Sequence, residues 1–222
     1  MKHVVITGAN RGIGLELTRL YAREHKVYAL CRKASVELEK MDQVRIIEDV
    51  ELTDLSSIRH ALAQCSDHID ILINNAGILQ RVGLSQIDDD EILSIKDQFC
   101  VNALAPLLMV QSAKRQLHPG SKVVLITSRM GSISDNTSGG HYGYRMSKSA
   151  LNAAGKSLAV DLQPEGVAVG ILHPGWVQTQ MTGHTGNYTV DQAASQLIER
   201  IDDLSLSNSG TFWHSNGERL GW

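Results

Sequence analysis

The chain has 222 residues, of which 42% are hydrophobic and 20% are charged, and its formal net charge at pH 7 is -3. This composition is typical of a globular protein, and the length predicts a single domain over residues 1–222. A slightly acidic chain has no electrostatic attraction to nucleic acid or to an anionic membrane, so we expect neither partner. No apolar run approaches the ~20 residues of a membrane span, and we expect a cytoplasmic protein.

The three cysteines, Cys31, Cys65 and Cys100, lie far apart in the sequence, and neither Cys-x-x-Cys nor His-x-x-x-His occurs. This pattern indicates neither a disulfide framework nor a zinc site. We therefore expect buried thiols and no bound metal.

Short runs of β-forming residues alternate with longer helical segments along the chain. Strands are predicted at residues 3–7, 26–31, 44–48, 69–73, 122–127, 167–173 and 211–213, and helices at residues 12–25, 35–41, 54–65, 89–117, 143–163 and 190–204. Runs such as Val123-Val124-Leu125-Ile126 are apolar without alternation, which indicates strands buried on both faces of a parallel sheet. The alternation predicts an α/β, single-domain Rossmann fold, with a doubly wound, mostly parallel seven-stranded sheet flanked by helices.

A glycine-rich turn joins the first predicted strand to the first predicted helix. Its sequence is Thr7-Gly8-Ala9-Asn10-Arg11-Gly12-Ile13-Gly14. In such a turn Gly8 permits the tight bend, Gly12 lets the backbone approach a pyrophosphate, and Gly14 lets the helix pack closely on the strand. The helix N-terminus adds free N–H groups and partial positive charge. A plain strand-to-helix turn is the alternative, but the position after the opening strand favours dinucleotide binding.

The second predicted strand ends with Cys31-Arg32-Lys33. NAD-binding folds usually place an acidic residue there to hold the ribose 2′-hydroxyl. Arg32 and Lys33, with Arg11 from the glycine turn, suit a 2′-phosphate instead, because a guanidinium binds two phosphate oxygens at once. We therefore expect NADP(H) to be preferred over NAD(H), with solvated surface charges as the alternative.

Tyr144 and Lys148 are four residues apart at the start of the predicted helix 143–163 and so share one helix face. An ammonium beside a phenol favours the phenolate, lowers the pKa of the phenol and makes it a better proton donor. An exposed pair on a solvated helix is the alternative. Together with the glycine turn, the pair indicates redox chemistry on a carbonyl group.

Three further segments complete an ordered pattern. Asn74-Asn75-Ala76-Gly77 follows the fourth predicted strand, Asn102 lies in the long helix 89–117, and Ser128 ends the fifth strand. With the glycine turn and the Tyr–Lys pair, this set resembles the short-chain dehydrogenase/reductase family over nearly the whole chain. The segments 131–140 and 210–218 and the short length are most similar to the carbonyl-reductase-like branch that includes sniffer and C-factor proteins.

The resemblance implies an NADP-dependent enzyme that reduces aldehyde or ketone carbonyls by reversible hydride transfer. It implies that Tyr144 donates the proton, that Lys148 favours the phenolate and holds the nicotinamide ribose, and that Ser128 bonds the carbonyl. Asn102 would bend its helix and hold a water that links Lys148 to solvent. By the same similarity, the cofactor contacts are Gly8, Asn10, Arg11, Gly12, Ile13, Gly14, Arg32, Lys33, Asp49, Val50, Asn75, Ala76, Gly77, Tyr144, Lys148, Pro174, Gly175, Val177 and Thr179.

The chain departs from the common family pattern in two places. Sixteen positions separate Ser128 from Tyr144, a little more than usual, and the segment 49–54 leaves room for a shift of a residue or two in the adenine contacts. Candidates for an apolar substrate wall, each of which could equally be core, are Met130, Ile133, Tyr142, Trp176 and Met181.

Two questions of function stay open on the sequence alone. A cofactor-binding regulatory or signalling protein with little turnover is the alternative to an enzyme, although a pure sensor needs no proton donor. By resemblance, the helices 89–117 and 143–163 allow a homodimer. The sequence predicts a small-molecule carbonyl substrate without identifying it.

Overall fold

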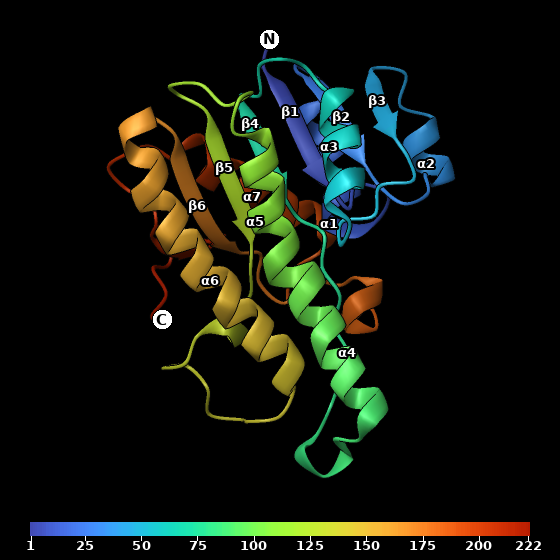
Figure 1. Cartoon of the computed structure of the whole chain (residues 1–222), viewed down its shortest axis with the longest axis vertical. Coiled ribbons are helices and arrows are strands. Elements are labelled where there is room, and N and C mark those ends of the chain that lie inside the picture. Colours follow the sequence, from blue (N-terminus) through green and yellow to red (C-terminus); the bar gives the residue numbers. More distant parts are fainter.

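A parallel seven-stranded sheet with the order β3-β2-β1-β4-β5-β6-β7 forms the centre of the molecule (Figure 1). The computed structural model describes residues 1–222 apart from the side chain of Gln86. The strands are β1 His3–Thr7, β2 Lys26–Leu30, β3 Val44–Ile47, β4 Ile71–Asn74, β5 Lys122–Ile126, β6 Ala168–His173 and β7 Phe212–His214. Every neighbouring pair of these strands is parallel, which confirms the predicted doubly wound sheet.

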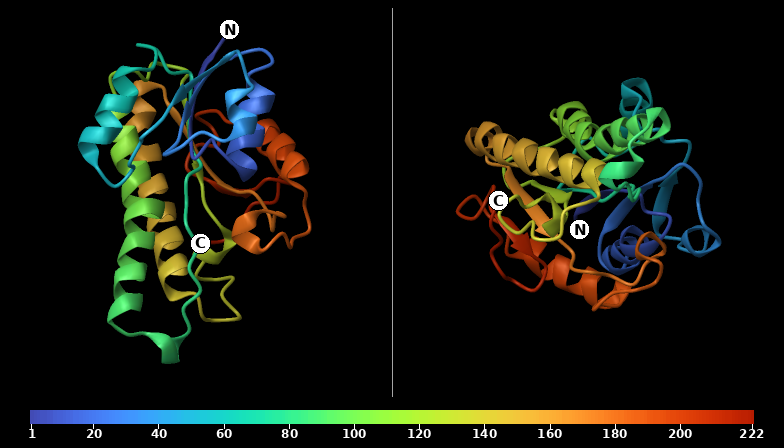
Figure 2. Two further views of the ribbon diagram at one scale, coloured as in Figure 1. Left: turned by 90° about the vertical axis from the view of Figure 1, so that its right-hand side faces the viewer. Right: turned by 90° about the horizontal axis from the view of Figure 1, so that it is seen from below.

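Helices cover both faces of the sheet in two layers (Figure 2). They are α1 Gly12–Tyr21, α2 Val36–Glu39, α3 Leu55–Ala63, α4 Asp89–Phe99, α5 Ala105–Ala113, α6 Tyr142–Leu162 and α7 Val190–Asp202. Successive residues of a strand point to opposite faces, so Val123 packs with the core under α3, α5 and α6. Its neighbour Val124 packs with the core under α1, α2 and α7. This arrangement explains why the β5 sequence is apolar without alternation.

The predicted helix 89–117 is interrupted where the structure places α4 and α5 end to end. Cys100–Leu104 forms a π-helical turn, in which the N–H of Ala105 bonds to the carbonyl of Cys100, five residues back. Pro106 follows in the first turn of α5. Because proline has no N–H, the carbonyl of Asn102 lacks its α-helical donor four residues on, and the α pattern gives way here.

By length and composition alone, the segment Asp89–Ala113, which includes the π turn, is apolar enough to cross a membrane, although the sequence analysis expected no such stretch. Core helices pass the same test. In this helix Gln98 and Asn102 are fully buried, and both hydrogen-bond to the segment that follows β4. The helix is therefore anchored in the fold by polar side chains as well as by apolar packing.

The cysteines differ in their burial. Cys31 is buried, whereas Cys65 and Cys100 are half-buried, and all three are free thiols. Burial raises the pKa of Cys65 to about 12. Such a thiol stays protonated and unreactive at neutral pH.

Candidate active site

A cleft of about 770 Å³ lies along the carboxyl ends of the strands, where open α/β sheets place their ligands. Fourteen of the predicted site residues line it, namely Gly8, Asn10, Arg11, Gly12, Ile13, Arg32, Val50, Asn75, Ala76, Gly77, Tyr144, Lys148, Pro174 and Thr179. Off the lining are Gly14, Lys33, Asp49, Asn102, Ser128, Gly175 and Val177. The structure thus gathers most of the predicted set in one place.

The glycine turn packs against the segment after β4 so closely that side chains are excluded. Gly8 has a φ of +66°, and a Cβ there would lie 2.9 Å from the Cα of Ala76. A Cβ on Gly14 would lie 2.2 Å from the carbonyl oxygen of Gly8. Gly14 therefore serves helix packing, as predicted, and the turn brings its backbone to the cleft.

The N-terminus of α1, like that of α6, lacks the side-chain cap that α3 and α7 have. Asp54 caps α3 and Thr189 caps α7 by accepting hydrogen bonds from backbone N–H groups. Among the described side chains none caps α1 in this way, and its first turn carries no acidic residue. The N–H groups at this end face the glycine turn and suit an anionic group such as a pyrophosphate.

The adenine end of the cleft is shifted along the chain from the predicted contacts. Val50 lines the cleft as expected, but Asp49 and Lys33 do not, while Glu51 and Leu52 do. Asp49 sits in the left-handed region with a φ of +57°, so the chain turns before it reaches the cleft. This shift of one to two residues agrees with the shift that the sequence of the segment 49–54 allowed.

Glu51 is a carboxylate at this end that the sequence analysis missed. Hydrogen bonds from the backbone and side chain of Thr53, together with the charge of Arg32, hold its pKa below the ordinary value. Glu51 follows the carboxyl end of β3, where open α/β sheets place their ligands, and this position in the sequence could have identified it. Arg32 therefore faces the cleft with an ionised neighbour.

Arg11 spans the cleft rather than pointing only along it. Its Nη1 donates to the side-chain oxygen of Gln180, which belongs to the segment after β6. A role for Arg11 at a 2′-phosphate stays a prediction, and the observed contact shows that the guanidinium reaches the opposite rim. Also on this rim and missed from the sequence are Gln178 and His184.

Tyr144 and Lys148 lie in the first two turns of α6, on its cleft-facing side, and both are buried, with 8% and 4% of their surface exposed. The Nζ of Lys148 lies 5.8 Å from the centre of the Tyr144 ring and donates to the carbonyl of Ile126 at 2.9 Å. This burial excludes the alternative of an exposed pair on a solvated helix. Because both residues line the cleft, a small molecule bound there can reach them.

Burial sets the acidity of both groups. It raises the pKa of Tyr144 to about 12, although a hydrogen bond with Ser128 acts in the opposite direction. It also lowers the pKa of Lys148 to about 8. The expectation that the ammonium would lower the pKa of the phenol is thus wrong for the protein alone, because desolvation outweighs it. The phenol is held protonated at neutral pH.

Ser128 follows β5 and lies in the segment that faces Tyr144. Its backbone is extended, and its Oγ accepts a hydrogen bond from the N–H of Met130 at 3.1 Å, which caps the short 3₁₀ turn Arg129–Gly131. The Ser128 side chain also lowers the pKa of Tyr144. Ser128 is 8% exposed, so this hydroxyl is held in a nearly dry environment.

Asn102 holds the segment after β4 against α6. Its Oδ1 accepts from the N–H of Ile78 at 2.8 Å, and its Nδ2 donates to the Ile78 carbonyl at 2.8 Å and to Ser147 Oγ at 3.0 Å. A Cβ on Gly77 would lie 3.2 Å from that Oδ1 and 3.6 Å from the Nζ of Lys148. A π turn lies at Asn102, where a bend was predicted, and both the bend and the water-holding role stay predictions.

The predicted apolar wall is mostly absent from the cleft. Only Met181 lines it. Ile133 is 79% exposed and Trp176 is 53% exposed. Pro174 lines the cleft, but Gly175 and Val177 pack on Tyr188 instead, through a close approach and a β-bridge. The substrate side is therefore open.

The site and the fold together define a class of protein, and comparison with known proteins agrees. Residues 2–188 match the model of the short chain dehydrogenase family, and the chain belongs to this family.

Among curated relatives, the chain is 36% identical, over all of both chains, to the 1-hydroxy-2-glutathionyl-2-methyl-3-butene dehydrogenase of Rhodococcus sp. (strain AD45). It is 40% identical to the C-signal protein of Myxococcus xanthus, over 71% of this chain and 95% of that protein.

Among solved structures the chain resembles the NADPH-bound carbonyl reductase from chicken fatty liver, with a TM-score of 0.89, 28% identity and coverage of 100% and 99% of the two chains. The carbonyl reductase Sniffer of D. melanogaster gives a TM-score of 0.88 at 30% identity over all of both chains. The predicted resemblance to this branch is confirmed.

Proposed function

We propose that the protein is an NADPH-dependent oxidoreductase that reduces aldehyde and ketone carbonyls by hydride transfer, with Tyr144 as the proton donor. The observation that carries this proposal is the buried Tyr144–Lys148 pair, whose tyrosine has its pKa lowered by Ser128, in the same cleft that the glycine turn opens. Membership of the short chain dehydrogenase family supports it, as does the similarity to carbonyl reductases.

The residues of the cleft fit the cofactor. The uncapped end of α1 and the glycine turn suit the pyrophosphate, and Arg32 at the adenine end suits a 2′-phosphate. When bound, NADPH would supply the hydride. The chicken relative binds this cofactor. Preference for NADP(H) over NAD(H) follows from the lack of an acid at the end of β2.

The side chains of the site would manage the proton. A carbonyl oxygen seated between the hydroxyls of Ser128 and Tyr144 would accept a hydrogen bond from each, which polarises the C=O bond. The phenol, held protonated by burial, would give its proton to that oxygen as negative charge develops there. The Ser128 hydrogen bond and the Lys148 ammonium would then stabilise the phenolate. A lysine with a pKa of about 8 also holds a proton at pH 7 that it can release to restore the phenol.

Carbonyl reduction can be measured as NADPH oxidation with a panel of aldehydes, quinones and diketones. We expect turnover by the wild type and almost none by Tyr144→Phe, with unchanged NADPH binding in both. Tight NADPH binding without turnover of any carbonyl would contradict the enzyme and favour the signalling alternative, which the similarity to C-signal keeps open.

A second candidate is oxidation of a bulky alcohol by the same residues working in reverse. It is favoured by the full-length similarity to a dehydrogenase whose name specifies a glutathionyl alcohol, and by the open substrate side of the cleft. NADP⁺ reduction would be compared for an alcohol with and without an attached glutathione. A strong preference for the conjugate would support this candidate.

We further infer that the protein is a cytoplasmic homodimer. Exposed apolar side chains lie on α4, the π turn, α5 and α6, namely Ile92, Leu93, Phe99, Leu104, Leu107, Met146 and Val160. Helices α4 and α6 lie side by side, so these side chains form neighbouring surface. Sedimentation measurements would test the dimer, since a monomer at high protein concentration contradicts it, and cell fractionation would test the location.

A further inference from the structure

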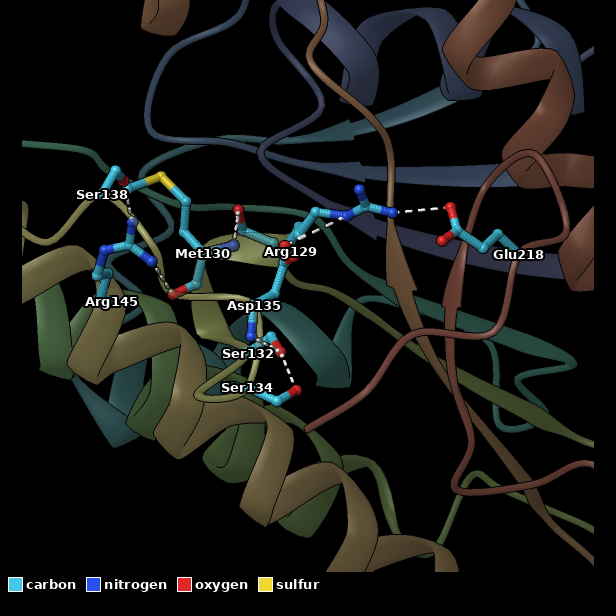
Figure 3. Close-up of polar contacts among 9 residues, drawn as sticks. Arg129, Met130, Ser132, Ser134, Asp135, Ser138, Arg145 and Glu218 are labelled. Atoms are coloured by element: carbon cyan, nitrogen blue, oxygen red, sulfur yellow. Dashed lines mark hydrogen bonds and ion pairs between the residues drawn. The ribbon is translucent and has the colours of Figure 1, made fainter.

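Arg129, the residue after Ser128, is held by acids from two different segments. Its Nη2 donates to the carboxylate of Glu218 at 2.7 Å, and its Nε lies 3.7 Å from a carboxylate oxygen of Asp135 (Figure 3). Asp135 belongs to the loop after β5, whereas Glu218 lies 89 positions after Arg129 in the chain. The guanidinium therefore joins the segment that carries Ser128 to the C-terminal part of the molecule.

The C-terminal segment that carries Glu218 is itself fixed to the sheet. It folds back along β7, where the N–H of His214 bonds to the carbonyl of Glu218 at 2.8 Å, and that of Leu220 bonds to the carbonyl of Phe212 at 2.9 Å. Its last residue, Trp222, stacks on Phe212 with ring centres 5.6 Å apart. Glu218 is thus presented by a firm hairpin rather than by a loose tail.

The same hairpin also contacts the loop after β5 through its backbone. The carbonyl of Trp222 accepts a hydrogen bond from the N–H of Ser134 at 2.9 Å. Within the loop, Ser132 Oγ accepts from the N–H of Asp135 at 3.2 Å and lies 3.2 Å from Ser134 Oγ. The acid that faces Arg129 is therefore held in place from both sides.

A second arginine ties the other side of this loop. Arg145, the residue after Tyr144, donates to Ser138 Oγ at 2.9 Å and makes longer contacts, at 3.4 Å, with the carbonyls of Met130 and Gly139. Figure 3 shows Arg145 and Arg129 on either side of the Met130 backbone. Each arginine directly follows a hydroxyl residue of the site.

We propose that Arg129 and Glu218 are positioning residues for Ser128, an inference that rests on the proposed carbonyl reductase function. The N–H of Met130 bonds to Ser128 Oγ, so the rotation of the turn Arg129–Gly131 decides where this hydroxyl lies relative to Tyr144. The ion pair fixes that rotation from the C-terminal hairpin. Loss of the pair would release the turn and move the hydroxyl away from the carbonyl oxygen.

Because the Arg129–Glu218 pair is exposed, a positioning role and a structural role predict different effects of its loss. The side chains of Arg129 and Glu218 are 39% and 56% exposed, and ion pairs of this kind add little to stability. Ser128 itself is buried. A change at Glu218 should therefore affect turnover far more than the unfolding temperature, because a displacement of about 1 Å at a reacting group can cost about 100-fold in rate.

Glu218→Gln tests the inference, with Glu165→Gln as a matched control. Glu165 pairs with Lys114 at 2.8 Å and is 40% exposed, but it is not part of the cleft. We expect Glu218→Gln to lower kcat for carbonyl reduction roughly tenfold. NADPH dissociation, followed by fluorescence, and the unfolding temperature should both match those of the wild type. Glu165→Gln should match the wild type in all three measurements.

Two further variants show whether the effect passes through Ser128. In a Ser128→Ala background, Glu218→Gln should cost nothing more, because the hydroxyl that it positions is gone. Arg129→Lys, which keeps the charge, should retain more activity than Arg129→Gln. In alcohol oxidation, where Tyr144 must ionise, Glu218→Gln should also move the pH profile upward, since the Ser128 hydrogen bond lowers the pKa of Tyr144.

Wild-type kcat in Glu218→Gln, or a loss that adds fully to that of Ser128→Ala, would overturn the positioning role and leave the reductase function intact. An equal loss in Glu165→Gln would also overturn it. A wild type that reduces none of the carbonyls would overturn both proposals together.

Discussion

The two sides of the cleft are built in different ways. The cofactor side consists of the glycine turn, the end of β2 and the segment after β4, all fixed by backbone packing at the strand ends. The substrate side consists of loops that side chains hold together over long distances in sequence, as Arg129 and Glu218 do. The sheet thus dictates the cofactor side, while the substrate side can change with a few polar residues. Four predictions probe this division.

The largest effect is expected at the junction of the two sides. Tyr144→Phe removes the proton donor, so kcat should fall about 10³-fold or more, in the range typical of general acids. The apolar ring still fills the site, so the unfolding temperature and NADPH affinity should stay near those of the wild type. Steady-state kinetics and fluorescence titration would measure both. A variant that keeps a tenth of the activity would mean that another group supplies the proton.

Backbone packing on the cofactor side is tested by Gly14→Ala. The new methyl group would meet the Gly8 carbonyl at 2.2 Å, and we expect a loss of about 3 kcal/mol in the free energy of unfolding, with weakened NADPH binding. Gly139→Ala is the comparison, because its Cβ meets open space and only its φ of +63° is strained, at about 1 kcal/mol. Denaturant unfolding would measure both. Equal losses would show that packing at the glycine turn is not the decisive factor.

Lys148 should make stability depend on pH. Burial lowers its pKa from 10.5 to about 8, so between these values the unfolded state binds the proton that the folded state has released. The contribution of Lys148 to the free energy of unfolding should therefore rise with pH across this window, by up to about 3 kcal/mol. Below pH 8 Lys148 is charged in both states, so the folded state bears the whole desolvation cost of the buried ammonium.

Lys148→Met should abolish this rise, whereas Lys156→Met, an exposed lysine of the same helix, should keep it. The comparison is best made below pH 9, since the raised pKa values of Cys31 and Cys65 lower stability above that value, and that of Tyr144 does so above pH 10. A flat profile in the wild type would show that the ammonium is better solvated than its burial indicates.

The smallest effect concerns the adenine end. Arg32→Ala should raise the KM for NADPH about tenfold and leave that for NADH nearly unchanged, because one charged hydrogen-bond partner of the 2′-phosphate is lost. Lys33→Ala should change neither KM by more than about twofold, since Lys33 does not line the cleft. An equal rise of the KM for NADPH in the two variants would mean that Arg32 and Lys33 act through their long-range positive charge rather than through a direct contact.

The cofactor side of the cleft could be predicted from the sequence far better than the substrate side. The strands, the glycine turn and the Tyr144–Lys148 face could be predicted because they follow from local periodicity and spacing. The Arg129–Glu218 pair could not, since no local pattern links residues 89 positions apart. The acidity of Tyr144 was misjudged because the spacing reveals the neighbouring ammonium but not the depth of burial. Asp49 was misplaced because its left-handed backbone carries no signature in the sequence.

The π turn has a consequence for how this family member tolerates insertions and deletions. It is a helix with one residue too many, placed between two stretches of ordinary pitch. Removing a single residue from Cys100–Leu104 would restore ordinary pitch and leave α4 and α5 at nearly the same rotation, because a π turn fits one more residue into a single turn than an α turn does. Gln98 would keep its bond to the segment after β4, whereas Asn102, inside the turn, would lose the position from which it bonds to Ile78. A deletion here would therefore disturb the Asn102 contacts without rotating the rest of the helix.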